Sequence, residues 1–179
     1  AVRLAAEENG KALPRSLDQA IRQLLCAEWP PEVIFSIDTD ADPLVPDGWQ
    51  VVDHVGSGKM YWAPQKVAVH YDGRQRQTDG YVSGHELRKS LKSLPLLNAN
   101  VLDFLLENPY FIPHEWKELN TAANDAVVFF WGTIYTNYAG QLCVRGASWR
   151  AHQSRWIGIY RILDAHFEAQ HPAAVYAPQ

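Results

Sequence analysis

The sequence predicts an α+β fold whose sheet is mainly antiparallel, with an N-terminal helix, a helical hairpin in the middle of the chain and a three-stranded aromatic meander near the C-terminus. Two observations favour this class. Strand-like segments are followed by helices and then by a run of strands, without the regular strand and helix alternation of parallel sheets. The 179 residues are 47% apolar and include seven Trp, eight Tyr and six Phe, enough to bury one core. We therefore expect a leader and helical arm over residues 1–32 and a single α+β domain over residues 33–179.

The first part of the chain predicts one helix and several short strands. Ser16 and Gln19 have the spacing of a capping box, which begins a helix that ends at Pro30. Residues 38–48 contain four Asp and two Pro and predict a loop. Strands are expected at residues 33–37, 49–55, 59–62 and 66–71, the last three as a second, smaller strand group.

The middle of the chain predicts two successive helices. Ser83 and Glu86 form a second capping box, and three leucines follow at i, i+4 and i+7. Asn100 can cap the next helix, over residues 101–107, which a proline at position 109 ends. We expect the two helices to pack as a hairpin on the sheet.

Residues 126–163 predict the aromatic meander. Its three apolar segments, at 126–135, 141–149 and 155–163, are separated by short turns, and the whole stretch carries four Arg and no Asp or Glu. Before it, a proline at position 113 suits the start of a short helix ending near Leu119. After it, residues 165–179 are polar and interrupted by proline, which predicts an irregular tail.

The meander also supplies the candidate binding residues. A four-residue loop over 151–154 would pair the two flanking arginines across the last two strands, and the same register places aromatic and arginine side chains on one face. The predicted ligand-binding residues are Arg145, Trp149, Trp156 and Tyr160. Such a face can stack bases, sugars or peptide side chains, with Arg adding cation–π attraction. The alternative is that these aromatics are core, and a one-residue register shift would bring Trp131 and Tyr135 into question instead.

The segment PLLNANVLDFLLENPYFIPHEWKE, followed by VVFFWGTIYTNYAGQLCVR and WIGIYRILD, resembles a family of short uncharacterised bacterial proteins. In that family an LNANVLDxLL-NP-x-IP-xxWK block precedes VFFWGTIY and further Trp-rich strands. The resemblance covers residues 46–175 and implies the limits of the domain, but no activity, cofactor or catalytic residue. Where relatives carry more Trp and Asp, this chain has the sequence RAHQSR between the last two strands.

The acidic loop supports a second, enzymatic hypothesis. Its alternating aspartates resemble a calcium loop, but Pro43 stands where a sharp turn needs Gly and Trp49 stands where the bidentate Glu belongs, which excludes an EF-hand. An irregular divalent-ion site stays open. The alternative function is a divalent-metal-dependent hydrolase or nuclease that uses loop aspartates and a histidine: Asp38, Asp40 and Asp42 with His54 or His85.

Other catalytic and cofactor motifs are incomplete. The GSGK at positions 56–59 lacks the first Gly and the Ser or Thr of a phosphate loop, and neither His-Glu pair extends to His-Glu-x-x-His. No Gly-x-Ser-x-Gly elbow occurs. We therefore expect no cofactor, no catalytic residue and no metal ligand in the predicted binding face.

Net charge, cysteine spacing and hydropathy limit the classes of partner and the location of the protein. A net charge of −4 gives no general attraction for polyanions, so nucleic acid is only weakly supported. Cys26 and Cys143 have no ligand spacing and predict free thiols, and no apolar run is long enough to cross a bilayer. The sequence thus favours a cytoplasmic, non-catalytic binding module for a protein, peptide or sugar, and leaves the oligomeric state open.

Overall fold

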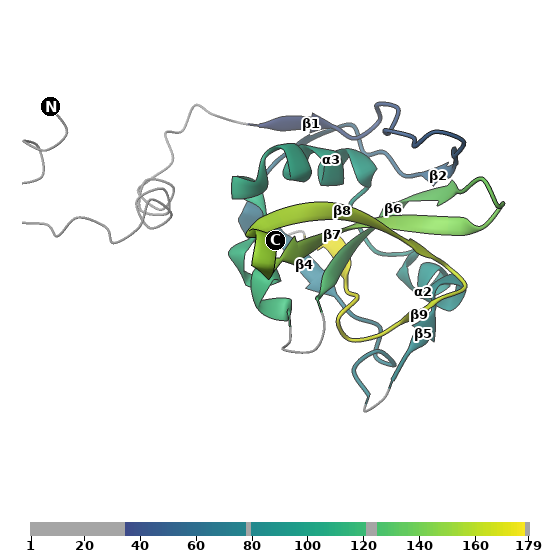
Figure 1. Cartoon of the computed structure of the whole chain (residues 1–179). Helices are drawn as coiled ribbons and strands as arrows, with labels where there is room; N and C mark the ends of the chain where they lie inside the picture. The colour runs from purple at the N-terminus through teal and green to yellow at the C-terminus, as the bar shows by residue number, and fades with distance from the viewer. Residues whose placement is uncertain (1–34, 78–79, 121–124, 178–179) are drawn as a thin grey trace, which may run out of the picture. The chain divides into compact units, whose positions relative to one another are not determined.

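A computed structural model of the protein describes residues 35–77, 80–120 and 125–177. All of these except Phe35 belong to one compact unit that begins at Ser36. The predicted leader and helical arm over residues 1–32 lie outside the described residues. The α+β class with a mainly antiparallel sheet is confirmed (Figure 1).

Six of the strands in the described part of the chain form the main sheet, and four form two small ones. The strands are β1 (Ser36–Asp38), β2 (Gln50–His54), β3 (Lys59–Tyr61), β4 (Val67–His70), β5 (Val82–Ser83), β6 (Val127–Thr136), β7 (Leu142–Arg150), β8 (Arg155–Ile162), β9 (His166–Phe167) and β10 (Ala173–Tyr176). The main sheet has the order β4-β10-β6-β7-β8, and β2 pairs with the second half of β6. Strand β1 pairs with β3, and β5 pairs with β9. Among the strand pairs of the described residues, β10 and β6 are parallel and the others are antiparallel.

Two helices and four short 3-10 turns connect these strands in the described residues. They are α2 (Gly84–Leu91), α3 (Ala99–Glu107), η1 (Pro64–Lys66), η2 (Pro109–Phe111), η3 (His114–Leu119) and η4 (Ala151–Gln153). The short helix predicted to end near Leu119 is therefore the 3-10 turn η3.

Two predictions about the strands are wrong. The segments predicted as a second strand group do not form one, because β2 joins β6 and β4 joins β10 in the main sheet. The tail predicted as irregular contains β10, which lies inside the sheet between β4 and β6. A four-residue strand after Pro172 has too little local pattern to be recognised, and its stability comes from partners more than forty residues away.

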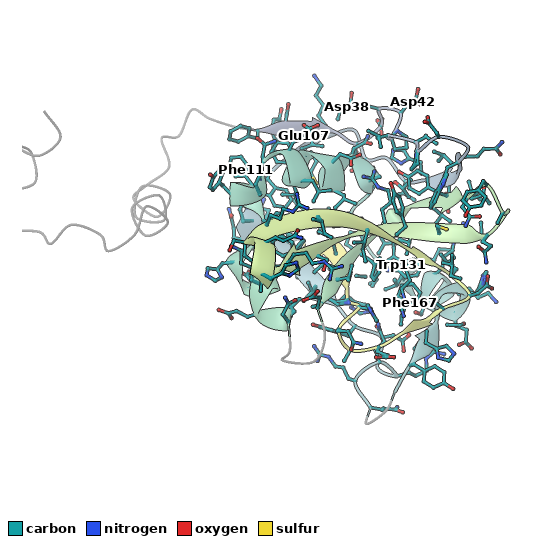
Figure 2. All side chains as sticks on the ribbon, viewed as in Figure 1. Asp38, Asp42, Glu107, Phe111, Trp131 and Phe167 are labelled. Carbon is teal, nitrogen blue, oxygen red and sulfur yellow. The ribbon has the colours of Figure 1, made fainter. Side chains whose placement is uncertain are left out.

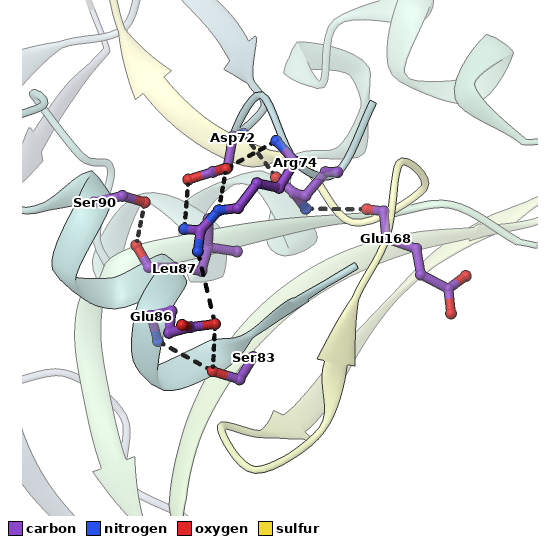
Figure 3. Close-up of polar contacts among 8 residues, drawn as sticks. Asp72, Arg74, Ser83, Glu86, Leu87, Ser90 and Glu168 are labelled. Carbon is purple, nitrogen blue, oxygen red and sulfur yellow. Dashed lines mark hydrogen bonds and ion pairs between the residues drawn. The ribbon is translucent and has the colours of Figure 1, made fainter. Parts of the chain in front are cut away.

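The first central helix, α2, begins as predicted. The Ser83 hydroxyl accepts a hydrogen bond from the Glu86 backbone N–H at 3.3 Å and faces the Glu86 carboxylate at the same distance (Figure 3). Arg74 lies 3.7 Å from that carboxylate and makes a two-armed ion pair with Asp72. The hydrogen bond from Arg74 holds the pKa of Asp72 well below its usual range. The start of α2 is thus fixed by a small charged network.

The second central helix, α3, begins two residues earlier than predicted. Asn98, not Asn100, is the N-cap, because its backbone is extended, its carbonyl accepts from Leu102 N–H, and its side chain accepts from Val101 N–H at 3.4 Å. The Asn100 side chain is free to turn outward, where it donates to two carbonyls of the acidic loop. The predicted end of the helix, just before Pro109, is confirmed.

The predicted hairpin of the two helices is wrong, because they follow each other in the chain but pack on opposite faces of the main sheet (Figure 1). Successive residues of β7 show this, since Val144 joins the core under α2 whereas Arg145 bonds to Asp103 of α3. The apolar core on the α2 face consists of Val82, Leu87, Leu91, Val127, Phe129, Trp131, Ile134, Val144, Leu163, Phe167 and Ala173. Figure 2 shows Trp131 and Phe167 side by side in this layer, with ring centroids 5.1 Å apart.

Candidate binding surface

The register of the last two strands agrees with the sequence prediction. Trp149 lies opposite Trp156, and Arg145 lies opposite Tyr160. The four-residue connection over 151–154 also forms, with Ser154 in the left-handed region at φ 50°. The structure therefore places the four predicted residues on one face of the meander.

Helix α3 crosses that face and divides it. The row between the two predicted pairs holds only Ala147 and Gly158, which lie opposite each other. Leu106 of α3 fills the space above this row, since a Cβ on Gly158 would be 3.0 Å from its Cδ1. The four residues thus form two separate sites: the tryptophan pair (Trp149 and Trp156) and the arginine–tyrosine pair (Arg145 and Tyr160).

The tryptophan pair is half-buried beside η3. The two rings are 5.6 Å apart and tilted by 57°, and the Lys117 ammonium lies 3.9 Å from the centre of the Trp149 ring. The Asn120 side chain donates to the Trp149 carbonyl. The Trp156 Nε1 is buried with no partner among the described residues. This end of the face is covered by the protein's own turn.

Arg145 is only 5% exposed and serves as a tie between β7 and α3. Its two terminal nitrogens donate to the two carboxylate oxygens of Asp103 at 3.0 and 2.5 Å. Burial alone would lower the pKa of Arg145, but the hydrogen bonds and charge of Asp103 outweigh it and raise the pKa above its ordinary value. The guanidinium lies 5.8 Å from the Tyr160 ring. The buried guanidinium therefore packs against the inner side of the Tyr160 ring.

The arginines of the meander are largely compensated by other segments. Besides Arg145, Arg150 forms an ion pair with Asp125. Arg161 donates twice to the His166 carbonyl, at 3.1 and 2.6 Å. The stretch without acidic residues is thus not a strongly basic surface, because carboxylates from outside it lie against two of its four guanidinium groups.

Tyr160 belongs to an exposed patch that sequence reasoning missed. Its ring is 44% exposed and lies 4.7 Å from the Trp49 ring, which also makes an edge contact with the buried Tyr135 at 6.3 Å. The Tyr135 hydroxyl donates to the Leu44 carbonyl at 3.2 Å. Other exposed apolar side chains lie beside this centre, since Val51 pairs with Tyr135 across β2 and β6 and Tyr138 lies beside Gly48. We define the Trp49–Tyr160 patch as Leu44, Trp49, Val51, Tyr138 and Tyr160.

The sequence around Trp49 gives little indication that this residue belongs to an exposed aromatic cluster. It follows Gly48, whose φ of 74° turns the chain out of the acidic loop, and its role depends on a strand more than a hundred residues away. A lone Trp at the end of an acidic, proline-containing loop is the one feature that could have indicated it.

The structure brings His54 to the acidic loop but not His85. Both ring nitrogens of His54 are engaged, Nδ1 with the Thr133 hydroxyl at 2.8 Å and Nε2 with the Thr39 carbonyl at 2.9 Å. His85 pairs with Asp164 at 3.0 Å. His54 therefore fastens the loop to the sheet.

Two of the loop aspartates accept hydrogen bonds from nearby backbone N–H groups. Asp38 accepts from the Asp40 N–H, and Asp40 accepts from the Gly58 N–H, each at 3.1 Å. Figure 2 shows Asp38 and Asp42 along the outer side of this segment. Among residues 35–77, 80–120 and 125–177, no group of three or more His, Cys, Asp or Glu side chains is placed to hold a metal ion.

Comparison of the chain with protein-family models, with curated proteins and with solved structures found no match. Cys143 is buried and free, and burial raises the pKa of its thiol, whereas Cys26 lies outside the described residues. In the part of the chain that the structure describes, no helix is long and apolar enough to cross a membrane.

Proposed function

We propose that the protein is a non-catalytic binding module whose contact surface is the Trp49–Tyr160 patch and whose partner is a protein or peptide. One observation carries the proposal: Tyr160 is 44% exposed while its ring is held against Trp49. An aromatic side chain that is fixed on one side and open on the other presents a large contact area at little entropic cost.

The composition of the patch supports a protein ligand over a polyanion. Tyr and Trp dominate binding hot spots, and the patch adds exposed aliphatic side chains and no basic residue of its own. The Arg145 guanidinium beside the Tyr160 ring forms an ion pair with Asp103. In this proposal Tyr160 contacts the partner, and Arg145 holds the Tyr160 ring in position. The half-buried Trp149 and Trp156 instead pack against η3.

The proposal can be tested by selecting peptides from a random display library on the wild-type chain and measuring their Kd for single variants. We expect Tyr160→Ala to weaken the selected peptides by about tenfold or more, as for a hot-spot residue. Tyr110→Ala is the matched control, because Tyr110 is exposed on η2 and outside the patch. Equal affinity for the Tyr160 and Tyr110 variants would contradict the proposal.

The same variants separate the other partner classes. Binding of oligosaccharides with the same dependence on Tyr160 would replace a peptide partner by a sugar. Single-stranded nucleic acid would instead bind with an affinity that falls steeply with salt. A thermal stabilisation by magnesium, manganese, calcium or zinc that is lost in Asp40→Asn would favour the hydrolase alternative at Asp38, Asp40 and Asp42.

A further inference from the structure

A second site lies apart from the Trp49–Tyr160 patch. A pocket of about 560 Å³ opens where the connection between α2 and α3 meets the end of β3 and the turn η1. This volume is within the range of pockets that hold small molecules, roughly 300 to 1,000 Å³. Its lining contains no residue of the Trp49–Tyr160 patch.

The inner wall of the pocket is apolar and rigid. Trp62, Leu97 and Val101 line it and are almost fully buried. The Leu97 backbone is fixed on both sides, since its N–H donates to the Ala174 carbonyl and its carbonyl accepts from the Gly132 N–H. The Trp62 ring is 6.3 Å from that of Phe104 on α3. An apolar ligand would therefore meet a wall that is already formed.

The polar groups of the lining divide into engaged and unengaged ones. The Thr39 hydroxyl bonds with the Ser57 N–H and the Gly58 carbonyl, and the Asn98 amide group bonds on both its oxygen and its nitrogen. Unengaged groups include the side chains of Lys59 and Lys66 and the Trp62 Nε1. None of these three has a hydrogen-bond or ion-pair partner within the described residues.

The unengaged groups named above are all hydrogen-bond donors, and two of them are cations. The Trp62 Nε1 is buried, so the unengaged donors that a bound ligand could reach are the two lysine ammonium groups. The lining includes two Lys and no Asp or Glu. Asp38 is opposite Lys59 in the β1–β3 ladder without forming an ion pair with it, so Lys66 carries the less compensated charge. An anionic ligand complements this wall, whereas a cationic one does not.

We propose that this pocket binds a small amphipathic anion, with its apolar body against Trp62, Leu97 and Val101 and its carboxylate or phosphate head group at Lys66 and Lys59. The ligand is a single molecule of a size that fits about 560 Å³. This site is independent of the protein or peptide partner proposed above.

Decanoate serves as the probe on the full chain, below its micelle concentration. Two compounds with the same alkyl chain, 1-decanol and decyltrimethylammonium, control for the head group. Indole N–H signals in a proton–nitrogen correlation spectrum report the position, because the seven Trp give resolvable peaks and Trp62→Phe identifies one of them. We expect decanoate to shift the Trp62 signal, decanol to bind more weakly and the cation to leave the signal unchanged.

Charge-removing variants test the head-group contact. Lys66→Met keeps the unbranched apolar stem and should weaken decanoate binding about five- to tenfold without changing the affinity for decanol. Lys92→Met is the matched control, since Lys92 is exposed just after α2 and outside the pocket. Ala63→Trp adds a ring to the pocket wall and should abolish binding of both compounds.

Three results would overturn this inference: no binding of decanoate at millimolar concentration, equal affinity in the Lys66 and Lys92 variants, or a shift at Trp49 in place of Trp62. The first two results do not bear on the Trp49–Tyr160 patch, whose own test depends on Tyr160, and the third would place decanoate at that patch without testing its peptide partner. A failure here is therefore distinguishable from a failure of the proposed function.

Discussion

On the face of the main sheet that α2 covers, side chains such as Leu87, Phe129 and Phe167 meet in a continuous hydrocarbon layer. On the face that α3 covers, the contacts also include specific polar partnerships, among them the Arg145–Asp103 ion pair and the Thr133 hydroxyl, which accepts from the backbone N–H of Ala99. Hydrocarbon packing stabilises broadly, whereas polar partnerships fix position, because each buried polar group costs free energy unless its partner is in place. Both helices bury apolar side chains, and α3 in addition makes the polar contacts that fix where the surface loops lie.

The largest expected effect tests the hydrocarbon face. Phe167→Ala removes a fully buried ring that contacts Phe129 and Trp131, and should lower the free energy of unfolding by about 3 to 5 kcal/mol. Urea denaturation measures it. Tyr81→Ala, which removes an exposed ring stacked on His166, should cost less than about 1 kcal/mol. Similar losses in the two variants would mean that the buried layer contributes no more to stability than an exposed ring does.

Next in size is the ion pair of the α3 face. Arg145→Met leaves the Asp103 carboxylate without its partner and should cost about 3 kcal/mol, toward the lower end for buried pairs because Asp103 is a quarter exposed. The double variant Arg145→Met with Asp103→Leu should recover most of this loss, since both charges are then removed. Arg155→Met, at an exposed site, is the control. If the double variant is no more stable than Arg145→Met, the loss does not come from the unpaired charge of Asp103.

A third prediction concerns pH and the hydrocarbon face. His171 is 6% exposed, with its ring 5.9 Å from those of Phe129 and Phe167, and burial together with the charge of Arg161 lowers its pKa to about 4. Because the folded-state pKa is below the unfolded value, the stabilisation is complete above pH 6.5 and is lost as the pH falls from 6.5 to 4. The expected loss is about 2 kcal/mol at pH 5.

The His171 contribution is measured by comparing urea denaturation at pH 7 and pH 5 in the wild type and in His171→Gln. The variant should lose about 2 kcal/mol less than the wild type between the two pH values. His152→Gln, on the exposed turn η4, should behave as the wild type does. If the free energy of unfolding falls equally with pH in the wild type and in His171→Gln, His171 does not cause the loss of stability.

The smallest effect sharpens the positioning role of α3. Asn100→Ala removes two exposed side-chain hydrogen bonds to the carbonyls of Asp38 and Ala41, and should cost about 1 kcal/mol while making the acidic loop more sensitive to limited proteolysis. Asp42→Asn in the same loop should change neither property. An unaltered proteolysis pattern in Asn100→Ala would mean that α3 does not position this loop.

Local rules account for what the sequence predicted correctly. The capping box at Ser83, the end of α3 before Pro109 and the register set by the loop at 151–154 each depend on residues close together in the chain. The two strands of a hairpin determine each other's pairing through the turn, so Trp149 and Trp156 could be paired from the sequence.

Distant partners account for what the sequence missed. The partner of Arg145 is Asp103 on a different element, and nothing near either residue indicates it except that Asp103 interrupts the otherwise apolar LDFLL. Strand β10 and the neighbour of Tyr160, Trp49, are likewise chosen by tertiary contacts. The predicted face was therefore right in register, while its covering by α3 and its division at Gly158 required the structure.

Strand β6 connects parts of the sheet that have no other link through strand pairing. Its first half adjoins β10 and its second half adjoins β2, and the irregular step between Phe129 and Ile134 lets the Gly132 backbone bond to Leu97 and Val55. A side chain at Gly132 would come within 2.9 Å of the Asn98 backbone, which leaves no room for one. A fluctuation that releases β6 frees β4 with β10, β2 and the rest of the meander together, so the six strands of the main sheet should open as one cooperative block.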